Sequence, residues 1–144
     1  MSVKPLVMKV SEHRCLLYSV AMILGTSVQE LETAVGHRGD PPKGHHFVEF
    51  IKPARSIGYT LCYVPVMPVN ISSEGHHPVY TQVQARQKLE DWLAKNYCVI
   101  LGKNKRGVGH AVAWFRTHGI DPSGGDRFTN PYALLDIEAI LIRF

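Results

Sequence analysis

Three side chains, far apart in the sequence, have the types and placement that thiol chemistry needs. Cys15 begins an apolar stretch of helical spacing, His110 begins a predicted strand, and Asp121 follows the next short strand. A cysteine attacks as its thiolate, so it needs a base that takes its proton and a third group that orients the imidazole. Such residues are typically distant in sequence and adjacent in the fold. The pattern predicts a cysteine nucleophile with a histidine base.

The surroundings of Cys15 favour this interpretation. A helix amino terminus offers free backbone N–H groups and a dipole that stabilise an anion. His13 and Arg14 add positive charge beside the thiol. The competing interpretation is a buried structural cysteine, because free cysteine is among the most buried residue types. The catalytic interpretation therefore depends on the histidine and the aspartate at the other end of the chain.

The first part of the chain is predicted to be mainly helical. Apolar residues recur at helical spacing over about 14–24 and again over 47–57, which indicates two amphipathic helices. Pro53 should kink or divide the later helix, because it removes a backbone donor. Ser27 and Glu30 have the spacing of a capping box, which predicts another short helix directly after the serine.

The second part is predicted to be mainly strands. Residues 97–102 and 109–115 are apolar and joined by a short basic turn, which predicts an antiparallel hairpin. An amphipathic helix is expected over 84–96 and a loop over 123–132. Further strands are expected over 59–66, 118–122 and 138–144. Helices first and most strands last indicate an α+β fold around an antiparallel sheet, with residues 1–144 as a single domain.

Two stretches resemble the papain-like cysteine peptidases. The run CLLYSVAMILGTSVQEL from Cys15 is similar to their nucleophile helix, and most similar to the branch that includes the leader peptidases of bacteriocin exporters. The run GHAV at 109–112, followed by Asp121 and Pro122, resembles their His strand and Asp-Pro element. The resemblance covers nearly the whole chain in order and spacing. It implies a papain-like fold, with an amino-terminal helical half packed on a carboxy-terminal antiparallel sheet half and a cleft between them.

The resemblance also implies roles for individual residues. Cys15 would be the nucleophile, His110 the general base and then acid, and Asp121 the orienting group. Asn130 is the alternative third member, because many papain relatives use asparagine there. The implied activity is cleavage of an amide bond in a peptide or protein through an acyl-enzyme thioester. An amidase, deamidase or transglutaminase-like enzyme would use the same triad with a different acyl acceptor.

The sequence departs from the family at the oxyanion hole. Lys9 stands six residues before the nucleophile, where the family commonly has a glutamine, and Leu16 follows the cysteine where the leader peptidases tend to have glycine. Lys9 and His13 are the candidate substitutes for the missing donor. Loss of one oxyanion donor can cost about 10²–10³ in rate. The alternative function is therefore a catalytically inactive papain-like module that binds a peptide or protein in the equivalent cleft.

Composition excludes several other classes. A chain of 144 residues suits a self-sufficient domain. Its formal net charge of +4 is too small to imply a nucleic-acid partner, because a nucleic-acid binder should cluster its charge on one face. Its apolar runs are too short for a signal peptide or a membrane span. We expect a cytoplasmic protein, small and intracellular or encoded by a virus or bacterium. The oligomeric state is left open.

The remaining cysteines and histidines predict no metal and no cofactor. The three cysteines are irregularly spaced, which argues against disulfides, and Cys62 and Cys98 lie in apolar strands that suggest the core. The eight histidines lack the spaced ligand pattern of a zinc site. His45 and His76 lie in loops that could border the cleft, where they are candidate substrate contacts.

Overall fold

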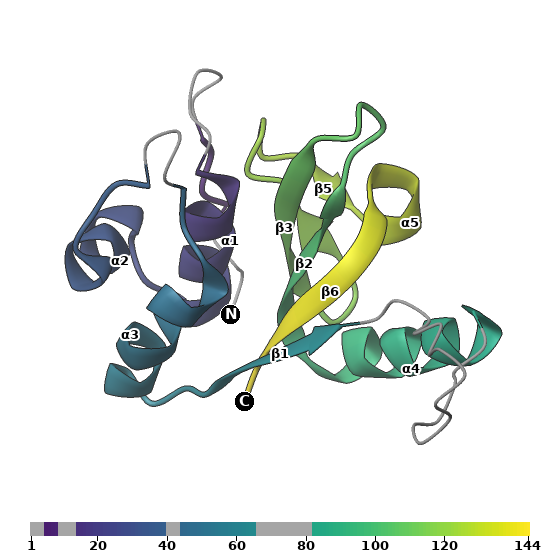
Figure 1. The fold of residues 1–144 in the computed structure, drawn as a ribbon, viewed down its shortest axis with the longest axis horizontal. Helices are drawn as coiled ribbons and strands as arrows, with labels where there is room; N and C mark the ends of the chain where they lie inside the picture. The colour runs from purple at the N-terminus through teal and green to yellow at the C-terminus, as the bar shows by residue number, and fades with distance from the viewer. Residues whose placement is uncertain (1–4, 9–13, 40–43, 66–81) are drawn as a thin grey trace, which may run out of the picture.

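The computed structural model describes residues 5–8, 14–39, 44–65 and 82–144. Helices come first along the chain and most strands last, as the sequence predicts (Figure 1). The elements in order are α1 (Cys15–Leu24), α2 (Val28–Val35), the 3-10 helix η1 (Phe47–Phe50), α3 (Ile51–Ser56), β1 (Leu61–Pro65), α4 (Gln82–Lys95), β2 (Tyr97–Lys103), β3 (Gly109–Phe115), β4 (Gly119–Ile120), β5 (Arg127–Phe128), α5 (Pro131–Leu134) and β6 (Asp136–Arg143).

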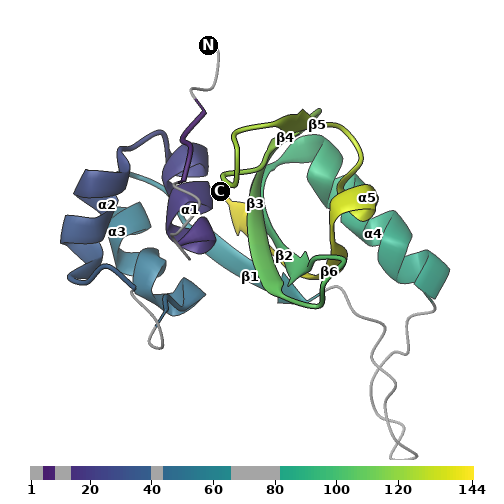
Figure 2. The ribbon, with the colours of Figure 1, turned by 90° about the horizontal axis from the view of Figure 1, so that it is seen from above.

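The described strands form one antiparallel sheet in the order β1-β6-β2-β3-β4-β5. Hairpin β2–β3 has the predicted bounds to within one residue, with Gly102 paired to His110. Figure 2 shows α1, α2 and α3 on one side of this sheet and α4 and α5 on the other. Strand β6, the last described strand along the chain, lies between β1 and β2 and is therefore hydrogen-bonded on both sides.

Strand alternation divides the core into two layers. Successive residues of a strand point to opposite faces, and β2, β3 and β6 are buried on both. The layer under α1 contains Val99, Ala111, Ala113, Phe115 and Leu141 together with the apolar residues of α1 and α2. The layer under α4 contains Cys98, Ile100, Val112, Trp114, Ile140 and Ile142 together with Leu89 and Leu93. The sheet therefore lies between two layers of helices, and α1 packs on one of its faces.

Helices α1 and α2 meet at a well-capped corner. Gly25 ends α1 in the left-handed conformation, with φ of 69°, which glycine adopts at low cost. Ser27 begins α2 by accepting the backbone N–H of Glu30 at 3.1 Å. The second half of the expected capping box differs, because the Glu30 carboxylate accepts the Thr26 hydroxyl at 2.8 Å instead.

Two local predictions need correction. The segment 47–57 is divided as expected, but the change from 3-10 to α-helix comes at Ile51, ahead of Pro53. Pro53 lies in the first turn of α3, where a backbone N–H has no intrahelical acceptor to lose. The predicted loop 123–132 in fact contains β5 and begins α5. Both are very short, and Asn130-Pro131, which suggested a turn, starts a helix because proline suits its first position.

The prediction for Cys62 is wrong and the one for Cys98 is confirmed. Cys98 is fully buried in β2, whereas Cys62 is exposed. Strand β1 lies at the edge of the sheet with β6 as its neighbour. Cys62 pairs with the buried Ile142 of β6, but among the described residues it is not part of either core layer. Among the described helices, none is both long and apolar enough to cross a membrane.

Candidate active site

Cys15 is the first residue of α1 and is half-buried. Arg14 precedes it as the N-cap, and no side chain caps the helix at that residue. The thiol therefore lies at the positive end of the α1 dipole, where an anion is stabilised. This is the placement that the sequence predicts.

His110 and Asp121 form a direct contact at the start of β3. Nε2 of His110 lies 2.9 Å from Oδ1 of Asp121, and their side chains are only 14% and 17% exposed. A carboxylate can only accept, so Nε2 carries the proton of this hydrogen bond. The same oxygen accepts the backbone N–H of Ser123 at 2.9 Å. The carboxylate is therefore held by the backbone while it holds the imidazole.

Cys15 lies close enough to His110 to act on its imidazole. The pKa of His110 is raised to about 9, first by the hydrogen bond to Asp121 and then by one to Cys15, against the effect of burial. Because Nε2 is bonded to Asp121, Nδ1 is the ring nitrogen left for the thiol. The structure thus brings together the nucleophile, base and orienting group named from the sequence. An imidazole with this pKa is mostly protonated at neutral pH.

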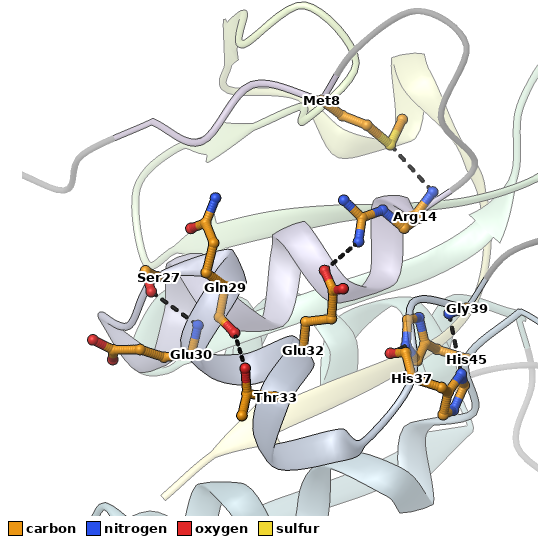
Figure 3. A network of polar contacts seen from close by, with 10 residues as sticks. All are labelled: Met8, Arg14, Ser27, Gln29, Glu30, Glu32, Thr33, His37, Gly39 and His45. Atoms are coloured by element: carbon orange, nitrogen blue, oxygen red, sulfur yellow. Dashed lines mark hydrogen bonds and ion pairs between the residues drawn. The ribbon is translucent and has the colours of Figure 1, made fainter.

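A segment near the amino terminus connects the two sides of this site. The backbone N–H of Met8 donates to the carbonyl of Pro122 at 2.8 Å, directly after Asp121. The Met8 sulfur accepts the backbone N–H of Arg14 at 3.3 Å, directly before Cys15 (Figure 3). The sequence reasoning missed Met8, because a single methionine outside any motif carries no local signal of such a link.

Arg14 does not act as an isolated positive charge beside the thiol. Its guanidinium forms a 2.7 Å ion pair with Glu32 of α2 and is 8% exposed (Figure 3). It also lies over the ring of Tyr18, 5.6 Å from the centroid. The ion pair joins the start of the nucleophile helix to α2 and offsets the charge that the sequence assigned to this position.

The remaining site candidates make contacts of their own or lie outside the described residues. Asn130 caps α5, where its side-chain oxygen accepts the backbone N–H of Tyr132 at 3.2 Å. His45 is joined to the carbonyl of His37 at 3.1 Å and stacks on its ring, and burial lowers the pKa of His45. Both histidines belong to the connection between α2 and η1 (Figure 3). Lys9, His13, His76 and the whole of the loop 67–80 lie outside the described residues.

The connection that carries His45 is ordered by its own polar contacts. His37 pairs with Glu49 at 2.5 Å through Nε2 and accepts the backbone N–H of Gly39 at its Nδ1. Gly39 is required here, since a Cβ would lie 2.2 Å from the His45 ring. These contacts give His45 a packing role within the helical half. In the part of the chain that the structure covers, no cluster of His, Cys, Asp or Glu is arranged to hold a metal.

Comparison with solved structures finds one fold that covers almost the whole chain. A double glycine motif protease from an AMS/PCAT transporter, solved in complex with the leader peptide, aligns over 98% of this chain and 92% of its own, with a TM-score of 0.56 and 16% identity. The fold is papain-like. At this identity the likeness concerns the fold alone. No protein-family model and no curated protein matches the chain.

Proposed function

We propose that this protein is a papain-like thiol hydrolase that cleaves an amide bond in a peptide or protein. Cys15 is the nucleophile, His110 the base and acid, and Asp121 the group that orients the imidazole. The observation that carries the proposal is the bond from Nε2 of His110 to the Asp121 carboxylate, with Cys15 as the second group that raises the pKa of His110. Each role needs that residue type, and all three come from distant parts of the sequence.

The reaction follows from these placements. The Cys15 sulfur attacks the amide carbon, and the carbonyl oxygen becomes an oxyanion that the backbone N–H of Cys15 helps to stabilise. The C–N bond then breaks, and the leaving amine takes the proton held by His110, which leaves a thioester. His110 next removes a proton from water, which attacks the thioester and releases a carboxylic acid. The C–S bond breaks in this step, which restores the Cys15 thiolate and the protonated His110.

Two observations support a peptide as the substrate. The structural neighbour is a protease that was solved with a leader peptide, and the two chains share their fold over nearly their full length. The candidate nucleophile is half-buried rather than enclosed, so an extended chain can reach it. We therefore propose a peptide substrate, with small residues such as paired glycines before the cleaved bond as the first sequences to test.

The thiols of this chain provide an internal control for the first experiment. The protein is treated with iodoacetamide at pH 6–8, and the adducts are mapped by mass spectrometry. We expect Cys15 to react before Cys62, although Cys62 is the more exposed thiol. Cys98 should react last, because burial raises its pKa to about 12. In the His110→Ala variant the advantage of Cys15 should disappear. Equal, slow labelling at Cys15 and Cys62 would contradict an activated thiolate.

The second experiment separates the enzyme from the inactive binding module. Peptides with and without paired glycines are incubated with the wild-type protein and with Cys15→Ala, and both cleavage and binding are measured. Cleavage by the wild type and binding alone by the variant support the hydrolase. Binding by both, with no cleavage and no acyl-enzyme mass at Cys15, would support the inactive module. Adding a peptide amine as an acyl acceptor during turnover distinguishes transfer from hydrolysis, since a transferase gives the new amide and a hydrolase gives the free acid.

A further inference from the structure

We propose that Ser19 is a positioning residue for this thiol chemistry, because its buried hydroxyl fastens the helix that carries Cys15 to the strand that carries His110. The inference rests on the proposed function and extends it by one residue. Ser19 touches neither of the two reacting side chains in the contacts described above. It acts on the distance and angle between the two elements that present them.

The geometry joins the two elements close to the reacting groups. Ser19 lies one helical turn after Cys15, and its hydroxyl donates to the backbone carbonyl of Ala111 at 3.2 Å. Ala111 directly follows His110 in β3. The bond therefore spans 92 positions of sequence and connects points one turn and one residue away from the thiol and the imidazole.

Ser19 is a polar residue in an apolar, fully buried environment. Its neighbours Val20 and Ala21 are fully buried and apolar, and Ser19 itself is 0% exposed. With Arg14 it is one of two buried polar side chains among the residues that the structure describes. An alanine of almost the same volume would fill the place without a polar group to satisfy. The hydroxyl contributes a fixed attachment point, which burial of apolar surface does not supply because it has no direction.

Strand β3 presents small side chains to α1 near His110. Three residues of β3 join the core layer under α1, and the two nearest His110, Ala111 and Ala113, are small and at most 2% exposed, whereas the third is Phe115 at the far end of the strand. Such small side chains let the α1 backbone come near the strand. Apolar contact with these small side chains has no preferred direction, so it does not by itself fix the position of α1 along its axis. A hydrogen bond from Ser19 fixes this one degree of freedom, and with it the distance from Cys15 to His110.

Three variants separate this role from ordinary stability. Ser19→Ala removes the hydroxyl and leaves the volume nearly unchanged. Ser19→Thr keeps the hydroxyl but crowds a fully buried place, so it should be less stable than wild type. Ile23→Val, near the other end of α1 and also fully buried, lowers stability through a small cavity while it leaves the Ser19 bond intact. Stability is measured by urea denaturation for all three.

The readouts are the pKa of His110, followed by NMR titration of its ring protons, and the rate of Cys15 alkylation at pH 7. We expect Ser19→Ala to slow alkylation about three- to tenfold, which is the factor that one lost hydrogen bond supplies. The pKa of His110 should move down toward its usual value as the thiol draws away. With a cleaved peptide, kcat should fall while KM changes little. Ser19→Thr and Ile23→Val should keep the wild-type pKa and kcat despite their lower stability.

The outcomes distinguish failure of this inference from failure of the proposed function. If Cys15→Ser leaves the pKa of His110 unchanged, the thiol and imidazole are not coupled in the wild type, and the proposed function falls. If they are coupled but Ser19→Ala behaves like wild type, only the role of Ser19 is overturned. The same holds if the pKa and kcat of all three variants simply follow their loss of stability.

Discussion

Oδ1 of Asp121 accepts Nε2–H of His110 at 2.9 Å, and the two residues come from adjacent parts of the sheet, the start of β3 and the end of β4. The same oxygen is fixed by the backbone N–H of Ser123. The imidazole is therefore oriented through a carboxylate that cannot turn without losing a second bond. This leaves the opposite ring nitrogen directed to the thiol, so one contact determines which tautomer the base adopts.

Replacing the carboxylate should separate orientation from charge. In Asp121→Asn the side-chain oxygen can still accept from His110 and Ser123, whereas Asp121→Ala loses both bonds. We expect the pKa of His110 to fall from about 9 toward 6.5 in both variants, because the negative charge is gone. Peptide cleavage should fall further in Asp121→Ala than in Asp121→Asn. Equal activity of the wild type and Asp121→Ala would show that the carboxylate has no part in the reaction.

The corresponding change at Asn130 should leave the chemistry unaltered. Its side chain caps the short helix α5, so Asn130→Ala should cost about 0.5–2 kcal/mol of stability, as loss of an N-cap does. The pKa of His110 and the alkylation rate of Cys15 should stay at wild-type values. A large drop in either, measured by NMR titration or mass spectrometry, would return Asn130 to the position of third triad member.

The raised pKa of His110 predicts a stability that falls on the alkaline side. The folded state holds this proton with a pKa of about 9, above the usual value near 6.5 in the unfolded chain. The contribution is complete below about pH 6.5 and is lost as the pH rises through 9. Urea denaturation between pH 6.5 and 9 should show this decline, and His110→Phe should remove most of it. His45 and His118 affect the pH dependence of stability at lower pH, because burial lowers the pKa of each.

The ion pair beside the nucleophile should stabilise the protein more than an exposed pair does. Glu32→Gln leaves the buried Arg14 guanidinium without its carboxylate at 2.7 Å, and we expect a loss of about 1–3 kcal/mol. The matched control is Glu90→Gln, which removes the exposed pair with Arg86 on α4 and should cost less than about 0.5 kcal/mol. Equal small losses in urea denaturation would mean that Arg14 is adequately solvated without Glu32.

The features that follow from local pattern were predictable from the sequence. The apolar periodicity gave the bounds of α1 almost to the residue, the Ser27–Glu30 spacing marked the start of α2, and the basic turn marked the β2–β3 hairpin. Cys15, His110 and Asp121 were identified because each begins or ends such an element. Their proximity in the structure follows once α1 packs on β3. The assignment of chemical roles to them stays a proposal.

The features that depend on which elements become neighbours could not be predicted. The bonds from Met8 to Pro122, from Arg14 to Glu32 and from Ser19 to Ala111 join distant segments with no motif of their own. The exposure of Cys62 follows from the place of β1 at the sheet edge, which its apolar neighbours in sequence do not reveal. Strand order is a property of the whole fold, so a local pattern carries no information about it.

Cys15 lies at the start of the chain and His110 in its last third, on opposite sides of the contact between α1 and β3. A chain made from its amino terminus exposes the cysteine long before the strand with its base exists. The proposed nucleophile therefore has no base until β3 has been made, and a fragment that ends before β3 never acquires one. Under the proposed function, hydrolysis begins only after β3 has packed on α1, so an unfolded nascent chain does not cleave itself or its neighbours.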